Sequence, residues 1–537
     1  MFSKYRALVG SKRVALPGAR LLGRANPHAI IEVTVKLRRK RELPELKGRL
    51  STTMKRGDLV EMYGAAETDA EMASRIFEAL GLRIVSVNLG SRTVRVSGTV
   101  AAMENAFLVK LFDYAHESGN YRGRVGYIHT PKELRDIVEG VFGLDSRRVA
   151  RRRKHPVRNI RNVRSLSLEG SWYTPAKLAA HYNFPAGDGA GQSVGLIEFG
   201  GGYFPDDLNA FCQTVGVSVP KVTAISTDGI PTNQEDGAEG EVMLDIEVVT
   251  GFCPNANIVV YFAQWTEQGW ITALDAVVHD TDNNPGVVSI SWGYAEDADL
   301  WTEQAMTQLN ETLKEAAYLN TTICVAAGDD GSSDAVTDGQ AHVDFPGSSP
   351  YVLSVGGTTM LTGDRTKTDI VWKEGDGLRA DGGGSTGGGV SAVFPRPDWQ
   401  KQVKIASVNP GAIVGRVVPD VAANADWTAS PYLLIVDGAS QPNGGTSAAS
   451  PLWAALITLI NGTRAATNRV GYLTPVLYQA HGGNGGTTVG AASCDDIVSG
   501  DNITDAAGGY SAGHGYDAVS GWGTPNGANL LEALSYV

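Results

Sequence analysis

The stretch 321–331, "TTICVAAGDDG", sets a run of apolar residues directly before a glycine and two carboxylates. A short apolar run that ends in such a turn is typical of a strand buried on both faces of a parallel sheet. The same form recurs in three earlier stretches, 193–202 "SVGLIEFGGG", 257–263 "NIVVYFA" and 286–293 "GVVSISWG", and helical periodicity lies between them at 272–281 and 301–319. The alternation predicts a doubly wound α/β fold with a mainly parallel sheet and functional groups at the carboxyl ends of its strands.

Residues 30–130 have the pattern of a smaller α+β unit. The pattern predicts a strand at 30–37, a capped amphipathic helix at 68–81, a hairpin at 82–99, and a short helix followed by a strand at 100–114. This order, βαββαβ, predicts a ferredoxin-like arrangement.

Charge is distributed unevenly along the chain. Residues 1–166 hold 33 Lys and Arg against 16 Asp and Glu, a net charge of +17, and the remainder holds 13 against 42, a net charge of −29. A basic segment that neutralises its own acidic partner explains both halves. The alternative, a nucleic-acid-binding N-terminal domain, predicts a steeply salt-dependent affinity for DNA or RNA.

The most basic run, 147–164 "RRVARRRKHPVRNIRNVR", has no apolar periodicity and is interpreted as an exposed, cleavable linker. We therefore divide the chain into an N-terminal domain at 1–146, a linker at 147–172 and a C-terminal domain at 173–537.

Composition excludes several classes of protein. The longest apolar run, near 452–460, is too short to cross a bilayer, which takes about 20 residues, and no standard secretory signal is visible at the N-terminus. Four widely spaced cysteines argue against a zinc cluster or a disulfide-built fold. The glycine-rich stretch 381–391 lacks a phosphate-binding pattern and is interpreted as a flexible loop.

Ser447 is the candidate nucleophile, because "GGTSAASP" at 444–451 runs straight into the apolar "LWAALITLI". A small-residue turn before a buried helix is one way in which hydrolases present a serine, although a serine in this place is also a common helix cap. No histidine stands in a His-Gly-Thr type turn, so a serine-histidine-aspartate triad has no evident imidazole.

Carboxylates are the alternative bases. Glu241 and Asp245 are four residues apart in "GEVMLDIEVV", so they share one face of a predicted helix, where a solvated acidic face is the simpler interpretation. Asp329 follows the strand in "VAAGDDG", at a carboxyl end where ligands bind but where turn residues are also common.

Seven motifs in this order resemble the sedolisins, serine-carboxyl peptidases related to subtilisin, and most closely the kumamolisin-like members. The motifs are "GEVMLDIEVV", "SISWG", "VAAGDDG", "HVDFPGSSPYVLSVGGT", "VPDVAANAD", "GGTSAASPLWAAL" and "GYSAGHGYDAVSGWG". The resemblance covers the chain from about residue 173 to its end and implies a subtilisin-like sheet. The N-terminal unit resembles the activation propeptide of that family.

The resemblance implies Ser447 as nucleophile, Glu241 as general base and acid, Asp245 as the acid that orients Glu241, and Asp329 as oxyanion-hole donor. Glu198 and Trp292 match positions that support the carboxylates. Asp344 in "HVDFP" and Trp292 are candidates to line the substrate cleft and to favour basic or bulky side chains, and a structural loop acid is an equally good interpretation of Asp344. Because free Glu and Asp titrate near 4.3 and 3.9, such a set is suited to acidic pH.

The C-terminal loops supply hard oxygen ligands that suit Ca²⁺. The resemblance implies one structural calcium ion held by Asp496, Asp517 and the carbonyl groups of Ile497, Gly513 and Gly515. It also implies protein or peptide substrates, a propeptide that acts as intramolecular inhibitor and folding aid, and a location outside the cell or in an acidic compartment. We expect a monomer, with no nucleic-acid or membrane partner.

The resulting prediction is an acid-active endopeptidase made as a self-processing zymogen and cut around residues 164–170. A tripeptidyl-peptidase of the same family and a non-catalytic, calcium-stabilised binding protein are the alternatives.

Overall fold

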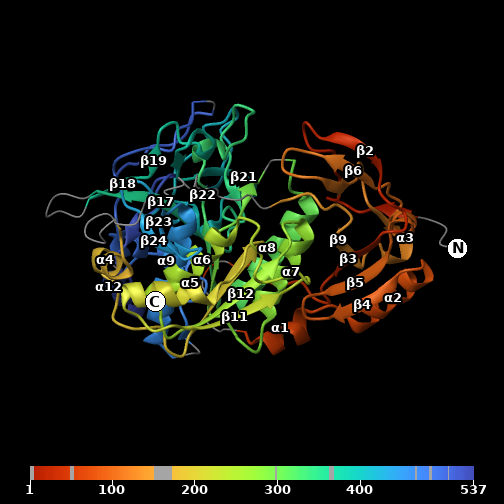
Figure 1. Ribbon diagram of the computed structural model, residues 1–537, viewed down its shortest axis with the longest axis horizontal. Coiled ribbons are helices and arrows are strands. Elements are labelled where there is room, and N and C mark those ends of the chain that lie inside the picture. The colour runs from red at the N-terminus through yellow and green to blue at the C-terminus, as the bar shows by residue number, and fades with distance from the viewer. Residues whose placement is uncertain are drawn as a thin grey trace.

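An eight-stranded sheet lies at the centre of the larger of two lobes in the computed structural model (Figure 1). The structure describes residues 5–46, 48, 54–149, 172–296, 299–361, 368–465, 468–482, 486–505 and 507–536. Those from 172 onward are called the C-terminal lobe, and those up to 149 the N-terminal lobe. The neighbouring strands run in the order β11 (Lys221–Ser226), β12 (Asn257–Ala263), β10 (Ser193–Phe199), β13 (Val287–Ile290), β15 (Thr322–Ala326), β17 (Leu353–Met360) and β18 (Asp369–Val371), with β23 (Val421–Asn424) also paired to β17. All these pairs are parallel except that of β17 with β18.

Side chains of the central strands alternate between two apolar cores. In β12, Ile258 and Val260 face one core, whereas Val259 and Tyr261 face the other. Helices α4 (Pro175–His181), α5 (Pro205–Val215), α6 (Glu239–Phe252) and α9 (Thr446–Gly462) pack in the first core, and α7 (Glu267–His279) and α8 (Glu303–Tyr318) in the second. Both faces are buried, which is why the strands read as continuous apolar runs, and the predicted doubly wound α/β fold is confirmed.

Smaller pairs of strands surround this sheet. They are β14 (Tyr294–Ala295) with β16 (Asp344–Phe345), β19 (Lys373–Glu374) with β20 (Gly384–Ser385), β21 (Gly389–Pro395) with β22 (Gly415–Val418), β24 (Tyr432–Val436) with β25 (Ala439–Asn443), and β26 (Cys494–Asp495) with β27 (Thr524–Pro525). Short helices α10 (Thr474–Leu477), α11 (Val489–Ser493) and α12 (Gly527–Ala533) lie near the C-terminus.

The glycine-rich stretch 381–391 is packed rather than flexible, so that interpretation is wrong for most of it. Residues 383–391 are buried and contribute to β20 and β21. A side chain at Gly387 would run into the backbone carbonyl of Ala327, next to the end of β15. The glycines therefore allow one backbone to lie close against another.

Helix α9 begins directly after Gly445, whose φ of 82° lies in the left-handed region that glycine adopts without strain. The Gly445 N–H donates to the carbonyl oxygen of Ala425 at 2.6 Å, which fixes the turn beside the carboxyl end of β23. Residues 446–461 are all buried. A helix in such surroundings is apolar on every side, as this one is.

The N-terminal lobe contains a four-stranded antiparallel sheet in the order β4 (Arg83–Asn88), β5 (Thr93–Thr99), β3 (Ile30–Leu37) and β9 (Val138–Phe142). Helices α2 (Glu67–Ala79) and α3 (Val100–Phe107) pack on it, and α1 (Arg56–Tyr63) precedes them. The predicted α+β arrangement is confirmed, but the fourth strand is β9. The strand predicted near residue 112 is β6 (Phe112–Ala115), which joins β2 (Arg20–Arg24) and β7 (Tyr121–Gly123) in another sheet; β1 (Tyr5–Ala7) pairs with β8 (His129–Pro131).

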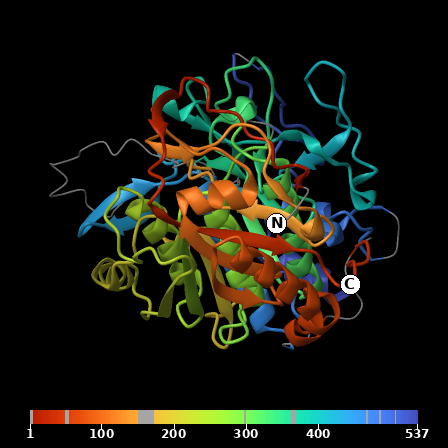
Figure 2. The ribbon, with the colours of Figure 1, turned by 90° about the vertical axis from the view of Figure 1, so that its right-hand side faces the viewer.

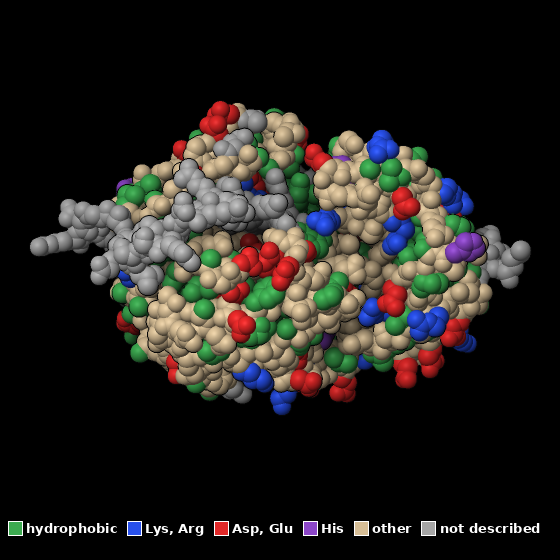
Figure 3. All heavy atoms as spheres, viewed as in Figure 1, with side chains coloured by type: hydrophobic (Ala, Val, Ile, Leu, Met, Phe, Trp, Pro, Cys, Tyr) green, Lys and Arg blue, Asp and Glu red, His purple; other side chains and the backbone are tan. Residues whose placement is uncertain are grey.

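The N-terminal lobe packs against α7 and α8, as two perpendicular views show (Figures 1 and 2). Leu43, Phe142 and Val149 enter the same apolar core as Trp270 of α7 and Leu309 of α8. In the space-filling view most of the visible Lys and Arg side chains lie on the N-terminal lobe (Figure 3).

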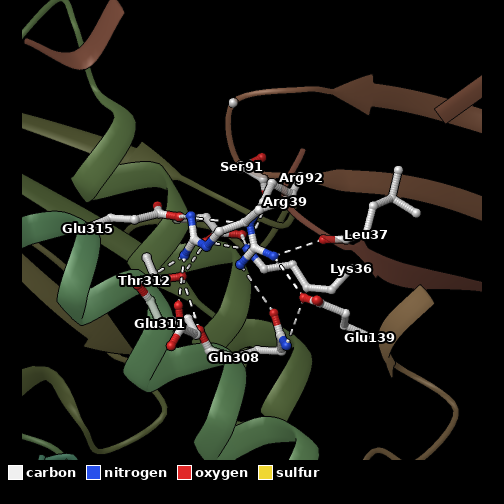
Figure 4. A network of polar contacts seen from close by, with 12 residues as sticks. Lys36, Leu37, Arg39, Ser91, Arg92, Glu139, Gln308, Glu311, Thr312 and Glu315 are labelled. Atoms are coloured by element: carbon white, nitrogen blue, oxygen red, sulfur yellow. Dashed lines mark hydrogen bonds and ion pairs between the residues drawn. The ribbon is translucent and has the colours of Figure 1, made fainter. Parts of the chain in front are cut away.

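Buried ion pairs join the two lobes around α8 (Figure 4). Glu315, with its side chain 2% exposed, pairs with Arg39 and lies 3.8 Å from Arg92, and both arginines come from the N-terminal lobe. Lys36 Nζ lies 2.7 Å from Asp275 Oδ2 on α7, and both groups are buried. The opposite charges found in the sequence therefore meet at this interface.

Most of the predicted linker 147–172 lies outside the described residues. Among the helices that the structure describes, none has both the length and the apolar character needed to span a bilayer.

Candidate active site

Ser447 is the second residue of α9, and its side chain is fully buried. Its hydroxyl donates to the carbonyl oxygen of Ser291 at 3.3 Å. The position at the start of a helix places the hydroxyl near the positive end of the helix dipole. Such a position favours negative charge that develops on or near the hydroxyl oxygen.

Ser291 connects Ser447 to Asp245. The Ser291 hydroxyl lies 2.9 and 2.7 Å from the two carboxyl oxygens of Asp245 and 3.2 Å from the carbonyl oxygen of Ser447. Ser291 follows β13, whereas Asp245 lies in the middle of α6. The end of a strand, a helix on one face of the sheet and the start of α9 thus meet at one point.

Three carboxyl groups gather beside this point. Glu198, near the end of β10, is fully buried, and its Oε2 accepts a hydrogen bond from the Trp292 indole at 2.9 Å. Glu198 and Asp245 act directly on each other, and Glu241 is close enough for its charge to act on both.

The cluster holds protons more tightly than free carboxyl groups do. Burial raises the pKa of Asp245 well above its ordinary value, and the neighbouring charges of Glu198 and Glu241 add to this, against the hydrogen bond from Ser291. Burial also raises the pKa of Glu198, together with the charge of Glu241, although the Trp292 indole opposes the shift. The structure therefore binds protons at this cluster in acid and loses them as the pH rises.

Asp329 lies at the carboxyl end of β15, beside the first residue of α9. Its Oδ1 accepts hydrogen bonds from the backbone N–H of Thr446, at 2.9 Å, and from the Thr446 hydroxyl. Its Oδ2 lies 3.9 Å from Nη1 of Arg379, which also pairs with Asp330. Asp329, the predicted oxyanion-hole donor, thus contacts Thr446, the residue directly before the predicted nucleophile Ser447.

Asp344 begins β16 and is buried beside the same strand ends. A side chain at Gly293 would run into its carboxyl group, and one at Gly328 would touch its Cβ atom. Gly293 follows Trp292 and Gly328 precedes Asp329. Asp344 therefore lies between two segments that carry predicted site residues.

Two family models match the chain, "Pro-kumamolisin, activation domain" at residues 17–147 and "Subtilase family" at residues 229–481. Kumamolisin from Bacillus sp. (strain MN-32) is 40% identical over 551 residues, which cover 99% of this chain and 96% of that protein. The chain belongs to the sedolisin family. As a sedolisin it is a serine-carboxyl peptidase that acts on peptides and has an N-terminal activation domain.

Two further similarities agree with this sedolisin membership. Tripeptidyl-peptidase sed5 of Aspergillus fumigatus is 30% identical over 592 residues, which cover 98% of this chain and 97% of that protein. The structure of Pseudomonas sedolisin, a serine-carboxyl proteinase complexed with two molecules of pseudo-iodotyrostatin, has a TM-score of 0.59 and 27% identity. The match covers 68% of this chain and 98% of the Pseudomonas sedolisin chain. The predicted subtilisin-like fold is confirmed.

The residues predicted to hold calcium in this sedolisin also come together. Asp496 Oδ2 accepts the Gly515 N–H at 2.9 Å, and Asp517 Oδ2 accepts the Gly513 N–H at 3.0 Å. Burial raises the pKa of Asp517, although backbone N–H donors oppose the shift. Among the described residues, none donates a hydrogen bond to the carbonyl oxygens of Ile497, Gly513 and Gly515. Two carboxylates and three open carbonyl groups fit an oxygen-binding cation such as Ca²⁺.

Groups of three or more His, Cys, Asp or Glu side chains that could hold a metal ion do not occur in the described part of this sedolisin. A calcium site made largely of carbonyl groups does not depend on such a group.

The sequence interpretation missed Ser291, Thr446 and Arg379. Ser291 stands beside Trp292 in "SISWG", so its place at a strand end was available as a signal. Thr446 precedes the nucleophile, but nothing in the chain marks its contact with Asp329. Arg379 lies in an irregular segment without periodicity, and only the fold brings it to Asp329.

Proposed function

We propose that this sedolisin is an acid-active endopeptidase, made as a self-processing zymogen, that cleaves peptide bonds through an acyl-enzyme on Ser447. The observation that carries the proposal is the buried series of contacts from Ser447 through Ser291 and Asp245 to Glu198, with Asp329 at the start of α9. We place the division of the chain at the predicted domain boundaries, with cleavage in the linker around residues 164–170.

In the proposed reaction, the Ser447 oxygen attacks the substrate carbonyl carbon while Glu241 accepts the hydroxyl proton. Asp329 serves as the oxyanion-hole donor to the oxygen that becomes negative, and one such donor is worth about 2.7 to 4 kcal/mol in hydrolases. The C–N bond then breaks, and Glu241 returns the proton to the leaving amine. Water then attacks the acyl carbon while Glu241 accepts a proton from it. Glu241 gives this proton to the Ser447 oxygen as the acyl group leaves.

Asp245 keeps Glu241 oriented in this scheme, and Glu198, Trp292 and Ser291 hold Asp245. A group with a raised pKa in the folded protein keeps its proton in acid and loses it as the pH rises. The cluster therefore has its working protonation state at acidic pH. Loss of these protons toward neutral pH would bring several negative carboxylates together and disorder the base.

The pH dependence of peptide cleavage tests the proposal. We expect maximal cleavage of a denatured protein in acid, a fall toward neutrality, and a loss of about 10²- to 10⁴-fold in kcat for Glu241→Gln, which removes the base. Asp329→Asn retains an N–H donor and should lose less at its own optimum. Glu239→Gln, on the same helix, is the matched control and should leave kcat within about twofold.

A wild-type optimum near pH 7, or a Glu241→Gln variant as active as the Glu239→Gln control, would contradict the carboxylate mechanism. The lengths of the products decide between the two peptidase activities. Internal fragments indicate the proposed endopeptidase, whereas a ladder of tripeptides indicates the second candidate, which the similarity to a tripeptidyl-peptidase favours.

We also propose that Asp496, Asp517 and the carbonyl groups of Ile497, Gly513 and Gly515 hold one Ca²⁺. The ion would neutralise two carboxylates and stabilise the C-terminal loops. A ligand at about 100 times its Kd adds about 2.7 kcal/mol to stability. A chelator should therefore lower Tm of the C-terminal lobe by about 3 to 4 °C, as measured by calorimetry.

Asp517→Asn should remove this dependence of Tm on calcium, whereas Asp505→Asn, an exposed acid in the neighbouring loop, should keep it. An unchanged Tm of the wild-type protein in chelator would contradict the site.

A further inference from the structure

The last residues described before the predicted cleavage region lie against Trp265. The N–H of Val149 donates to the backbone carbonyl oxygen of Trp265 at 2.6 Å, and the Arg148 guanidinium lies 5.0 Å from the centre of the indole ring. Val149 is 1% exposed. One backbone hydrogen bond and one cation–π contact thus hold an extended piece of chain on this tryptophan.

Trp265 also borders the candidate active site. Its ring packs edge-on against Trp292 at 4.9 Å, and Trp292 donates to Glu198 of the carboxyl cluster. Trp265 comes two residues after β12, which pairs with the strand that carries Glu198. Two indole rings, those of Trp265 and Trp292, therefore connect the chain held on Trp265 with the buried carboxyl groups.

The surroundings of Trp265 fix the ring and favour a cation. A side chain at Gly200, whose φ is 78°, would collide with the indole nitrogen and with a carboxyl oxygen of Asp236. Asp228 accepts the backbone N–H of Gln264, the residue before Trp265, at 2.8 Å. One carboxylate, Asp236, thus lies near the indole ring, Asp228 holds the backbone of the preceding residue, and Gly200 leaves room for the ring.

We propose that Trp265 is a specificity-determining residue for peptide substrates. Its indole face takes an arginine side chain of the substrate, and its carbonyl oxygen accepts the N–H of the following residue, as seen with Arg148 and Val149. Both residues lie on the N-terminal side of the cut predicted at 164–170, at least 15 residues before it. The contact therefore shows which side chain Trp265 accepts, and the test finds the position of that side chain relative to the cleaved bond. This inference rests on the proposed peptidase function and adds a substrate class to it.

The test compares peptides that carry arginine or citrulline at successive positions N-terminal to the cleaved bond. Citrulline has nearly the shape of arginine without its charge. For the self-processed enzyme we expect one position at which arginine exceeds citrulline in kcat/KM by about threefold to thirtyfold, the range of cation–π contacts.

Trp265→Leu should reduce that ratio below about twofold, and Trp265→Phe should keep an intermediate ratio, because phenylalanine retains a ring face. Gln264→Leu changes the exposed neighbour and is the matched control, with the wild-type ratio expected. If Trp265→Leu fails to process itself, the wild-type and Trp265→Phe ratios still decide the matter.

Equal cleavage of arginine and citrulline peptides at every position by the wild-type enzyme would overturn the inference, as would an unchanged ratio in Trp265→Leu. Failure of the proposed function looks different, because no peptide would then be cleaved and Ser447 would not be labelled by a serine-reactive inhibitor.

Discussion

Ser447→Ala is expected to abolish both peptide cleavage and self-processing while leaving the fold intact. Removal of a hydroxyl nucleophile that works as a unit with its base lowers kcat by about 10⁴-fold or more. The buried Ser447 hydroxyl makes a single 3.3 Å hydrogen bond to a backbone carbonyl, so its loss should change stability little. After incubation near pH 4, mass spectrometry should find the variant at full length and the wild-type chain cut.

Ser450→Ala is the matched control for this prediction. Ser450 lies about one turn further along α9, is also fully buried, and hydrogen-bonds to the hydroxyl of Ser289 at 2.9 Å. Its replacement should leave kcat within a few-fold of wild type. Equal processing by the Ser447→Ala variant and the wild type would mean that another nucleophile, or another protease, makes the cut.

The sequence predicts this fold well because its strongest signals are local. A strand such as β12 is buried on both faces and is therefore apolar throughout, and the helices between the strands keep their own period. The fourth strand of the N-terminal sheet was misplaced for a physical reason. Strands β6 and β9 have similar local character, and only pairing with β3 over a long distance in sequence distinguishes them.

The candidate site also has a part that the sequence predicts and a part that only the tertiary structure shows. Ser447, Glu241, Asp245 and Asp329 stand in ordered motifs, so the family resemblance finds them. The contacts that tune them come from tertiary structure: Ser291 reaches Asp245 across the sheet, and Arg379 reaches Asp329 from an irregular segment. Glycines that look flexible in the sequence, such as Gly387, are fixed by backbone packing that the sequence does not display.

Part of the charge asymmetry of the chain meets in buried ion pairs between the lobes. Glu315 on α8 accepts a hydrogen bond from His279 at 2.8 Å and pairs with Arg39, whose side chain is 3% exposed. Burial alone would raise the pKa of Glu315, but Arg39, His279 and Arg92 outweigh it, and the pKa is lowered. Two of these three partners leave with the activation domain.

We therefore expect proton binding to be linked to release of the activation domain. A carboxyl group whose pKa is lowered in the joined state favours that state at higher pH. This contribution begins to fall where the separated Glu315 takes up a proton, and it is lost as the pH falls toward the lowered pKa of the joined state. Acid thus weakens the interface while it protonates the carboxyl cluster at the active site. Both effects favour activity at the same end of the pH scale.

Glu315→Gln should raise the pH at which self-processing begins by about one unit or more. The substitution removes a buried negative charge and leaves Arg39 and Arg92 with less compensation, and breaking a buried pair in this way typically costs about 3 to 5 kcal/mol. Each pH unit of a linked proton corresponds to about 1.4 kcal/mol. The measurement is the midpoint pH of cleavage in a series of buffers at constant ionic strength.

Glu311→Gln provides the matched control on the same helix. Glu311 lies 3.2 Å from Arg39, but its side chain is 29% exposed, so its pair with Arg39 is screened by water and is worth about 1 kcal/mol or less. Its replacement should move the midpoint by a few tenths of a pH unit at most. A Glu315→Gln midpoint at or below that of the wild type would show that the interface resists acid for another reason, because weakening it at this point could then not release the activation domain earlier.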